Sequence, residues 1–153
     1  LYEDGTLQHA GVLTGINGSA GHYFKGYKND AHYFNMNVIR NVAGVTGACL
    51  LTKRSLYEQL GGLDSLLFKV SYNDIDYCLK VRKAGFLIVY TPYTEIYHYE
   101  SKSRGYEDTP EKKARHDREK LSLQNKWGSY LSEDVYSNPN FSKQSEHNDL
   151  HIK

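Results

Sequence analysis

The chain has 153 residues, 39% of them hydrophobic and 24% charged, which is the length and composition of one compact globular domain. Its formal net charge of +1 argues against electrostatic capture of nucleic acid, which requires a concentrated basic face. The sequence contains no run of about 18 apolar residues, so none of its segments is expected to cross a bilayer.

The N-terminal residues predict a β-hairpin. Asp4-Gly5 is a tight-turn sequence, and residues 7–14 are predicted to form the returning strand. Only Leu1 and Tyr2 remain for the first strand, so we expect a further part of the fold to precede Leu1. Residues 15–37 are rich in Gly, Asn, His and Tyr without a sustained period, which predicts a long loop with a function or with mobility.

The middle of the chain predicts a strand and a short helix. Residues 38–51 contain the apolar run 48–51, which is typical of a buried strand. Thr52 is predicted to cap a helix over residues 53–60, and Gly61-Gly62 is predicted to end it.

A longer helix is predicted next. Ser71 and Asp74 have the spacing of a capping box, with Ser71 as the cap and Asp74 at the third helical position. The helix is expected to run to about Ala84 and to end at Gly85, which can adopt a left-handed conformation.

Two strands and a charged helix complete the prediction. Residues 86–90 and 94–99 are predicted to form strands. Thr109-Pro110-Glu111 predicts a helix start, because Pro at the first helical position and an acid in the first turn are both favoured. Leu121, Gln124 and Trp127 are predicted to mark the face by which this helix packs. From Leu131 onward the sequence is polar and rich in Asn, which predicts an extended, fraying tail.

The cysteines and tyrosines allow more than one interpretation. Cys49 and Cys78 lie in apolar contexts without paired spacing, which predicts two buried, reduced thiols, and a disulfide between them is the alternative. The 14 tyrosines suit a sugar-binding surface, because a tyrosine ring covers apolar C–H patches while its hydroxyl forms hydrogen bonds. The simpler interpretation is that many of them are half-buried strand residues.

A pair of carboxylates is the first indication of chemistry. Asp74 and Asp76 lie two residues apart near the start of the predicted helix. A carboxylate in such a position can act as a general base that takes a proton from a hydroxyl group as it attacks. On spacing alone, the simpler interpretation is that Asp74 caps the helix and Asp76 complements its dipole.

Six blocks spread over most of the chain carry a more specific signal. They are D-G-T-L-Q-H-A-G (4–11) with G-H (21–22), V-T-G-A-C-L-L-T-K-R-S (45–55), G-G-L-D (61–64), N-D-I-D-Y-C-L-K-V-R-K-A-G (73–85), Y-H-Y-E-S-K-S-R-G (97–105) and D-V-Y-S-N-P-N-F (134–141). In this order the blocks resemble the motifs of family 2 glycosyltransferases, especially the bacterial rhamnosyltransferase-like enzymes of surface polysaccharide assembly.

The resemblance implies an α/β fold: the C-terminal portion of a GT-A, or nucleotide-diphospho-sugar transferase, fold with a mixed sheet flanked by helices. Residues 1–130 would form the acceptor-side half of the catalytic domain, and residues 131–153 the polar tail. The family's first acidic motif, a D-x-D-like pair on a strand end that holds the metal and the nucleotide, is absent from this sequence. We therefore expect catalysis by the parent enzyme and not by this chain alone.

The resemblance also implies roles for the two acids. Asp74 matches the family's catalytic base and would deprotonate the acceptor hydroxyl during a single displacement at the anomeric carbon. Asp76 is assigned to the substrate-binding region, where it would order the start of the helix and the neighbouring loop. His9 and His22 match the family pattern without an assigned role.

Further site residues follow from the same resemblance. His98 would complete the coordination of a divalent cation, Mn²⁺ or Mg²⁺, on the donor diphosphate, and an imidazole suits Mn²⁺ better. Arg104 would bind the diphosphate in bidentate fashion, and Gly47 and Ala48 would contact substrate. The simpler interpretations are that His98 ends a strand and that Arg104 is a solvated loop residue.

The implied partners are a nucleotide-sugar donor and a glycan or lipid-linked acceptor, with no nucleic acid. A lipid-linked acceptor would place a cytoplasmic enzyme at the inner face of the bacterial membrane. The first alternative is a non-catalytic glycan- or partner-binding module that uses the aromatic residues of segment 23–34. The second is a structural fragment that self-associates through an exposed sheet edge.

Overall fold

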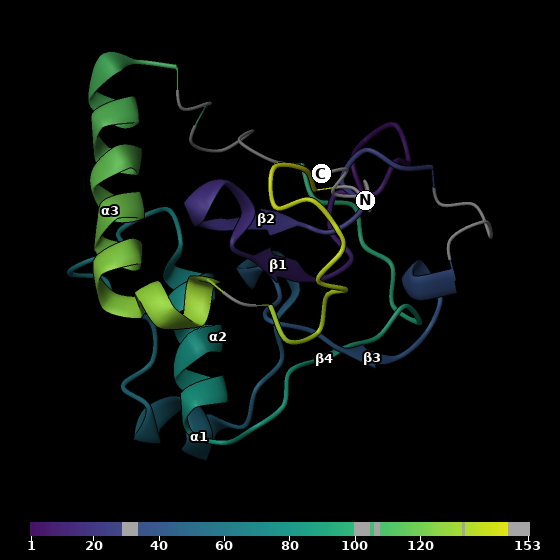
Figure 1. Ribbon diagram of the computed structural model, residues 1–153, viewed down its shortest axis with the longest axis horizontal. Coiled ribbons are helices and arrows are strands. Elements are labelled where there is room, and N and C mark those ends of the chain that lie inside the picture. Colours follow the sequence, from purple (N-terminus) through teal and green to yellow (C-terminus); the bar gives the residue numbers. More distant parts are fainter. Residues whose placement is uncertain (29–33, 100–104, 106–107, 133, 147–153) are drawn as a thin grey trace.

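A computed structural model describes residues 1–28, 34–99, 105, 108–132 and 134–146. Within this part of the chain, two small sheets and three α-helices form an α/β arrangement (Figure 1). The strands are Val12–Thr14 (β1), Ala20–His22 (β2), Arg40–Asn41 (β3) and Val89–Tyr90 (β4), and the α-helices are Arg54–Gln59 (α1), Asn73–Lys83 (α2) and Pro110–Ser132 (α3). Short 3₁₀ helices cover Ile16–Gly18, Phe34–Met36 and Gly47–Cys49. The α/β class agrees with the prediction, but both sheets are antiparallel pairs and not parts of one mixed sheet. No helix in these ranges combines the length and apolar composition that a membrane crossing requires.

β1 and β2 form a hairpin that reverses at Gly15. Leu13 pairs with Gly21, and Gly15 has a φ of 89°, a left-handed conformation that favours glycine. The backbone N–H of Leu7 donates to the carbonyl of Tyr27 at 2.7 Å, so the two arms stay paired beyond the regular strands.

This hairpin corrects two predictions. The Asp4-Gly5 turn is present and is closed by a backbone hydrogen bond from Tyr2 to Thr6. The strand predicted over residues 7–14, however, is regular only at its end and pairs forward with residues 20–22, inside the segment predicted as a loop. The pairing runs forward because the reversal at Gly15 brings the following residues alongside.

The second sheet is shorter than predicted. Arg40 pairs with Tyr90, so the strand predicted over residues 86–90 is regular only at its end. Residues 94–99 form no strand. A strand exists only where a neighbouring strand accepts its hydrogen bonds, and β3 pairs only with Val89 and Tyr90.

The apolar run 48–51 is neither a strand nor buried. Gly47–Cys49 is a 3₁₀ helix capped by Thr46, whose hydroxyl accepts a hydrogen bond from Ala48 N. Leu51 is 100% exposed, and Cys49 is exposed as well, although a buried thiol was predicted there. Cys78 is buried as predicted, and burial raises the pKa of its thiol to about 12. Both cysteines are free.

α1 and α2 confirm the two predicted helices but not their caps. Lys53 precedes α1, while the Thr52 hydroxyl pairs with the Tyr77 hydroxyl at 2.8 Å and caps nothing. Tyr72 precedes α2 with a left-handed φ of 65°, and no side chain caps this helix. The hydroxyl of Ser71, the predicted cap, instead lies 3.2 Å from the Nδ1 atom of His116.

The predicted helix terminators are confirmed. Gly61, Gly62 and Gly85 follow α1 and α2 with φ values of 74°, 59° and 85°. These conformations are accessible to glycine and strained for other residues.

α3 begins at Pro110 as predicted and runs along one side of the β1–β2 hairpin, next to α2 (Figure 1). The predicted packing face is right for Trp127, which is buried, and for Gln124, which donates to the carbonyl of Gly18 at 2.8 Å, but not for Leu121, which is 56% exposed. The buried side chains of α3 join β1 and α2 in one hydrophobic cluster, to which the helix contributes Leu123, Trp127 and Leu131. Each such side chain contributes roughly 1.5–3 kcal/mol when fully buried.

Residues 134–146, which the sequence places in a polar tail, lie against the hairpin. The carboxylate of Asp134 accepts a hydrogen bond from Thr14 N at 2.9 Å, and that of Glu146 accepts one from His22 N at 2.7 Å. The backbone N–H of Asn17 donates to the carbonyl of Lys143 at 3.0 Å.

Candidate active site

Asp74 lies in the first turn of α2 with its carboxylate held by two backbone N–H groups. Its Oδ1 atom accepts from Ile75 N at 2.8 Å, and its Oδ2 atom accepts from Gly47 N at 2.8 Å. The residue is partly exposed. A carboxylate has about four lone-pair sites, so these two bonds fix its orientation and leave acceptor capacity for a hydroxyl group.

The turn at residues 46–49 brings Gly47 next to Asp74, and Ala48 is the residue that follows it. The Gly47 amide contacts the carboxylate directly, and the Thr46 hydroxyl fixes the Ala48 amide at 3.4 Å. An N–H donated to a carboxylate is a charge-assisted hydrogen bond, which is stronger than a neutral one. Asp74 and this turn therefore hold each other in place.

A cleft of about 890 Å³ lies beside the turn. We call it the apolar cleft; its wall includes Leu7, Met36, Val45, Ala48, Leu50, Leu51, Leu56, Phe86, Leu87, Val89 and Ile96. Several of these side chains are largely exposed, with Leu87 at 63%. Large apolar side chains gathered in one exposed cleft indicate a surface that another molecule or chain segment covers.

Asp76 is 0% exposed and lies between α2 and α3. Its Oδ1 atom accepts from Trp127 Nε1 at 2.7 Å and lies 2.8 Å from Lys126 Nζ, while Lys80 Nζ lies 3.1 Å from Oδ2. Lys126 also bonds Asp64 at 3.0 Å, so it joins two of the sequence blocks. This burial favours a positioning role for Asp76 over direct contact with a substrate. Sequence reasoning missed Lys126, which the pattern shows only as one of many charges on α3.

His98 follows β4 in the chain and contacts the N-terminal segment. It is exposed, its Nδ1 atom lies 2.9 Å from the Oε1 atom of Gln8, and its backbone N–H donates to the carbonyl of Leu1 at 2.9 Å. It contributes to the wall of the apolar cleft, as Ala48 does. Arg104 lies outside the described residues. Among those that are described, no three His, Cys, Asp or Glu side chains gather closely enough to hold a metal ion, so these residues alone do not assemble a metal centre.

His9 and His22, to which the sequence assigns no role, lie directly behind the turn. Their Nδ1 atoms are 2.9 Å apart, and the Nε2 atom of His9 accepts from Thr46 N at 3.2 Å. Burial, together with the neighbouring charges of His22, Arg40 and the α-amino group of Leu1, lowers the pKa of His9 to about 3. His9 is therefore neutral at physiological pH.

This pKa predicts that the chain loses stability in mild acid. In the unfolded chain His9 takes up a proton below a pH of about 6.5, whereas in the folded chain it does so only near pH 3. Between these values the unfolded state binds more protons, so the free energy of unfolding falls by about 2 kcal/mol from pH 6.5 to pH 5 through this residue alone. Urea unfolding of the chain at both pH values measures the loss. His9→Gln, which does not titrate, should remove that share of the pH dependence, and an equal dependence in the two proteins would contradict the prediction.

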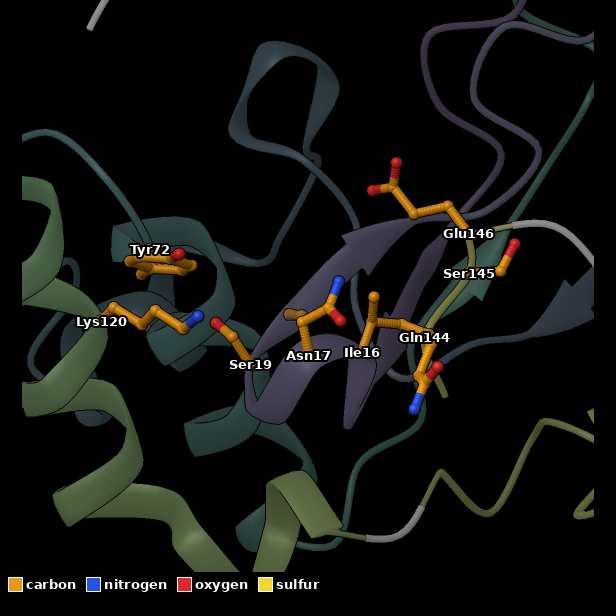
Figure 2. Close-up of a pocket in the computed structure, with 9 residues that line it drawn as sticks. Ile16, Asn17, Ser19, Tyr72, Lys120, Gln144, Ser145 and Glu146 are labelled. Carbon is orange, nitrogen blue, oxygen red and sulfur yellow. The ribbon is translucent and has the colours of Figure 1, made fainter. Parts of the chain in front are cut away.

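A second pocket, of about 470 Å³, lies between the hairpin turn, α3 and the tail. Figure 2 shows Tyr72 and Lys120 on one side of this pocket, Gln144 and Glu146 on the other, and Ser19 between them. Most of its lining side chains are polar, and Tyr72 is two residues before Asp74. The start of α2 thus contributes one side chain to this pocket and places Asp74 beside the turn that borders the apolar cleft.

Comparison with known proteins gives one family and several relatives. Residues 22–125 match the family model described as "Glycosyltransferase like family 2". The chain is 46% identical over 141 residues to the uncharacterized protein y4gI of Sinorhizobium fredii, and 36% identical over 114 residues to the O-antigen biosynthesis protein RfbC of Myxococcus xanthus. It is 36% identical over 77 residues to the N-acetylglucosaminyl-diphospho-decaprenol L-rhamnosyltransferase of Mycobacterium tuberculosis.

These alignments cover 91%, 72% and 50% of this chain, but only 16%, 9% and 25% of the respective relatives. The chain therefore corresponds to a minor part of each of these proteins. No solved structure gives a significant match.

Proposed function

The chain belongs to the family 2 glycosyltransferases and is similar to rhamnosyltransferases, and we propose that it forms the acceptor-side half of an inverting GT-A catalytic domain. This half would bind the acceptor and activate its hydroxyl group, while a nucleotide-binding half would hold the donor. The observation that carries the proposal is the Asp74 carboxylate, fixed by two backbone N–H groups beside the cleft and with acceptor capacity to spare.

The proposed reaction is a single displacement. The acceptor oxygen forms a bond to the anomeric carbon of the donor while the bond from that carbon to the phosphate oxygen breaks. The nucleoside diphosphate leaves with the bonding electrons, and Asp74 takes the hydroxyl proton. A carboxylate is a sufficient base, because the hydroxyl becomes acidic only as the new bond forms. One displacement inverts the anomeric configuration.

The other predicted site residues support Asp74 in this proposal. Gly47 and Ala48 would form the edge of the acceptor site. Asp76 would hold the start of α2 in place through its contacts with Trp127 and Lys126 of α3. Arg104 would bind the donor diphosphate, and His98 would supply one ligand to a divalent cation on it. Since the described residues of this chain do not by themselves complete a metal site, we assign the other ligands to the donor and to the nucleotide-binding half.

We further propose that the nucleotide-binding half packs on the apolar cleft. The fully exposed Leu51 and the apolar wall around it support this occupant, as do the much greater lengths of the relatives. The family's first acidic motif, which we assign to that half, would then lie across the cleft from the turn that holds Asp74. A second copy of this chain is the other occupant that a test must distinguish.

Leu51→Ser tests the packing of the cleft. In the isolated chain this substitution should change the free energy of unfolding by less than about 0.5 kcal/mol, because the side chain is fully exposed. In the full-length product of the gene it should cost about 2 kcal/mol, because the side chain would be buried there. Urea unfolding of both proteins measures the difference.

Val135→Ser is the matched control, because Val135 is exposed and lies outside the cleft; it should be neutral in both proteins. A neutral Leu51→Ser in the full-length product would show that the cleft is not covered by the rest of that polypeptide. A mass of the isolated chain that rises with concentration, and falls with Leu51→Ser, would indicate a second copy instead.

For the substrates, we propose a nucleoside-diphosphate L-rhamnose donor and a lipid-diphosphate-linked sugar as acceptor. Support comes from the similarity to an enzyme named for transfer of L-rhamnose to N-acetylglucosaminyl-diphospho-decaprenol. Such an acceptor would place the enzyme at the cytoplasmic face of the membrane. The test is a transfer assay of the full-length gene product with a panel of nucleoside-diphosphate sugars. Transfer from the L-rhamnosyl donor supports the proposal, and a folded protein that transfers none of them would overturn it.

A glycan-binding module is the second candidate function, and the pocket of Figure 2 is the observation that favours it. In the segment 23–34, which was expected to bind sugar, Tyr23 and Phe24 are buried in the core, Tyr27 is half-buried, and residues 29–33 lie outside the described part of the chain. Tyr72 offers a half-buried ring among polar groups in their place. This function predicts that the isolated chain binds oligosaccharide, that Tyr72→Ala abolishes binding, and that Asp74→Asn does not.

A further inference from the structure

Residues from three distant sequence blocks form one chain of hydrogen bonds that ends at Asp74. His22 on β2 contacts His9 at 2.9 Å, His9 accepts from Thr46 N at 3.2 Å, and the next amide, Gly47 N, donates to Asp74 at 2.8 Å. The His9 and His22 rings meet edge to face, with an angle of 81° between their planes. The path therefore runs from the hairpin through one turn to the proposed base.

The contacts determine where the imidazole protons lie. Because Nε2 of His9 accepts the Thr46 N–H, it carries no hydrogen, and the neutral ring must carry its hydrogen on Nδ1. That Nδ1–H donates to Nδ1 of His22, which then carries its own hydrogen on Nε2. Protonation of His9 at Nε2 would place two N–H groups against each other at Thr46. Burial of the ring and its electrostatic interactions with His22 and Arg40 also oppose this protonation.

We propose that His9 and His22 are positioning residues for Asp74. His9 holds the Thr46 peptide, and through it the orientation of the Gly47 N–H that aligns the Asp74 carboxylate. His22 selects the His9 tautomer that can accept from Thr46. The role of Asp74 as base rests on the proposed function, whereas the effect of the two histidines on the turn does not.

Hydrogen exchange of the ¹⁵N-labelled chain, followed by NMR, tests this proposal without an activity assay. In His9→Leu the amides of Thr46 and Gly47 should exchange about tenfold faster, since Thr46 loses its acceptor and the turn loosens. In His9→Gln the amide oxygen replaces the Nε2 acceptor, so protection should return. The amide of Leu79, in the buried part of α2, reports global unfolding, so exchange at Thr46 and Gly47 should accelerate by more than exchange at Leu79.

The imidazole ¹⁵N shifts test the tautomer at pH 7. The wild-type chain should show a protonated Nδ1 and an unprotonated Nε2 in His9, and His22→Leu should shift this balance toward the other tautomer. Unchanged exchange at Thr46 and Gly47 in His9→Leu, or the opposite tautomer in the wild-type chain, would overturn the proposal.

The link to catalysis has its own readout in the full-length gene product. His9→Leu should lower kcat about tenfold with little change in KM for the donor, and His9→Gln should restore most of kcat. If exchange responds as expected while Asp74→Asn retains turnover, the two histidines position the turn and Asp74 is not the base. If exchange does not respond, the positioning role fails whatever the function of Asp74.

Discussion

Replacing Asp74 with Asn in the full-length gene product should lower the rate of sugar transfer by at least about a hundredfold. Asn has nearly the same shape and can still accept a hydrogen bond from one of the two backbone N–H groups that hold the carboxylate. It has no basic oxygen to take the proton of the acceptor's hydroxyl group as the new bond forms. The measurement is kcat with a saturating donor, together with the donor dissociation constant, which should stay nearly unchanged because the donor binds elsewhere.

Two further measurements make the Asp74 result specific. Asp117→Asn removes an exposed carboxylate on α3, far from the turn in sequence, and should leave kcat unchanged. The unfolding midpoint of Asp74→Asn should match that of the wild type, so that a loss of rate is not a loss of fold. Turnover within a few-fold of wild type would refute the assignment of Asp74 as the base.

Replacing Asp76 with Ala should lower the free energy of unfolding by about 3–5 kcal/mol, which is the range for breaking a buried ion pair. The substitution removes the acceptor of the Trp127 N–H and leaves Lys80 and Lys126 without their buried partner. It also leaves a gap between α2 and α3, where the side chain is completely buried. Urea unfolding of the isolated chain measures the loss, and circular dichroism shows whether the variant still folds.

Asp74→Ala is the matched control for Asp76, because the two acids are neighbours on the same helix. It should cost less than Asp76→Ala, about 1–2 kcal/mol, since its side chain is partly exposed and water can replace the acceptor of its two backbone hydrogen bonds. Asp76→Asn should fall between the two, because its oxygen can still accept from Trp127. A loss of under about 1 kcal/mol in Asp76→Ala would show that the buried contacts of Asp76 do not hold α2 to α3. If both predictions hold, the two acids have different roles: loss of Asp74 lowers the rate of transfer, and loss of Asp76 lowers the stability.

The sequence by itself determined the features that depend on a few adjacent residues. The start of α3 at Pro110 and the ends of α1 and α2 at glycines follow from backbone preferences that act within one helical turn. The family followed from six blocks of residues in a fixed order, and the matching family model spans residues 22–125. Asp74 was singled out in the same way, from its place in one of these blocks.

Only the tertiary structure decided the pairings and the exposure. An apolar run at 48–51 predicts burial but cannot show what would cover it, and in this structure Leu51 is fully exposed. Ser71 was expected to cap α2, but its hydroxyl contacts His116, which lies forty-five residues further along the chain. Asp76 contacts Lys126, and His9 contacts Thr46, although the two residues of each pair are far apart in the sequence. Strand pairs, buried ion pairs and hydrogen-bonded histidines form between segments far apart in the chain, so their energy depends on the whole fold and leaves no local pattern.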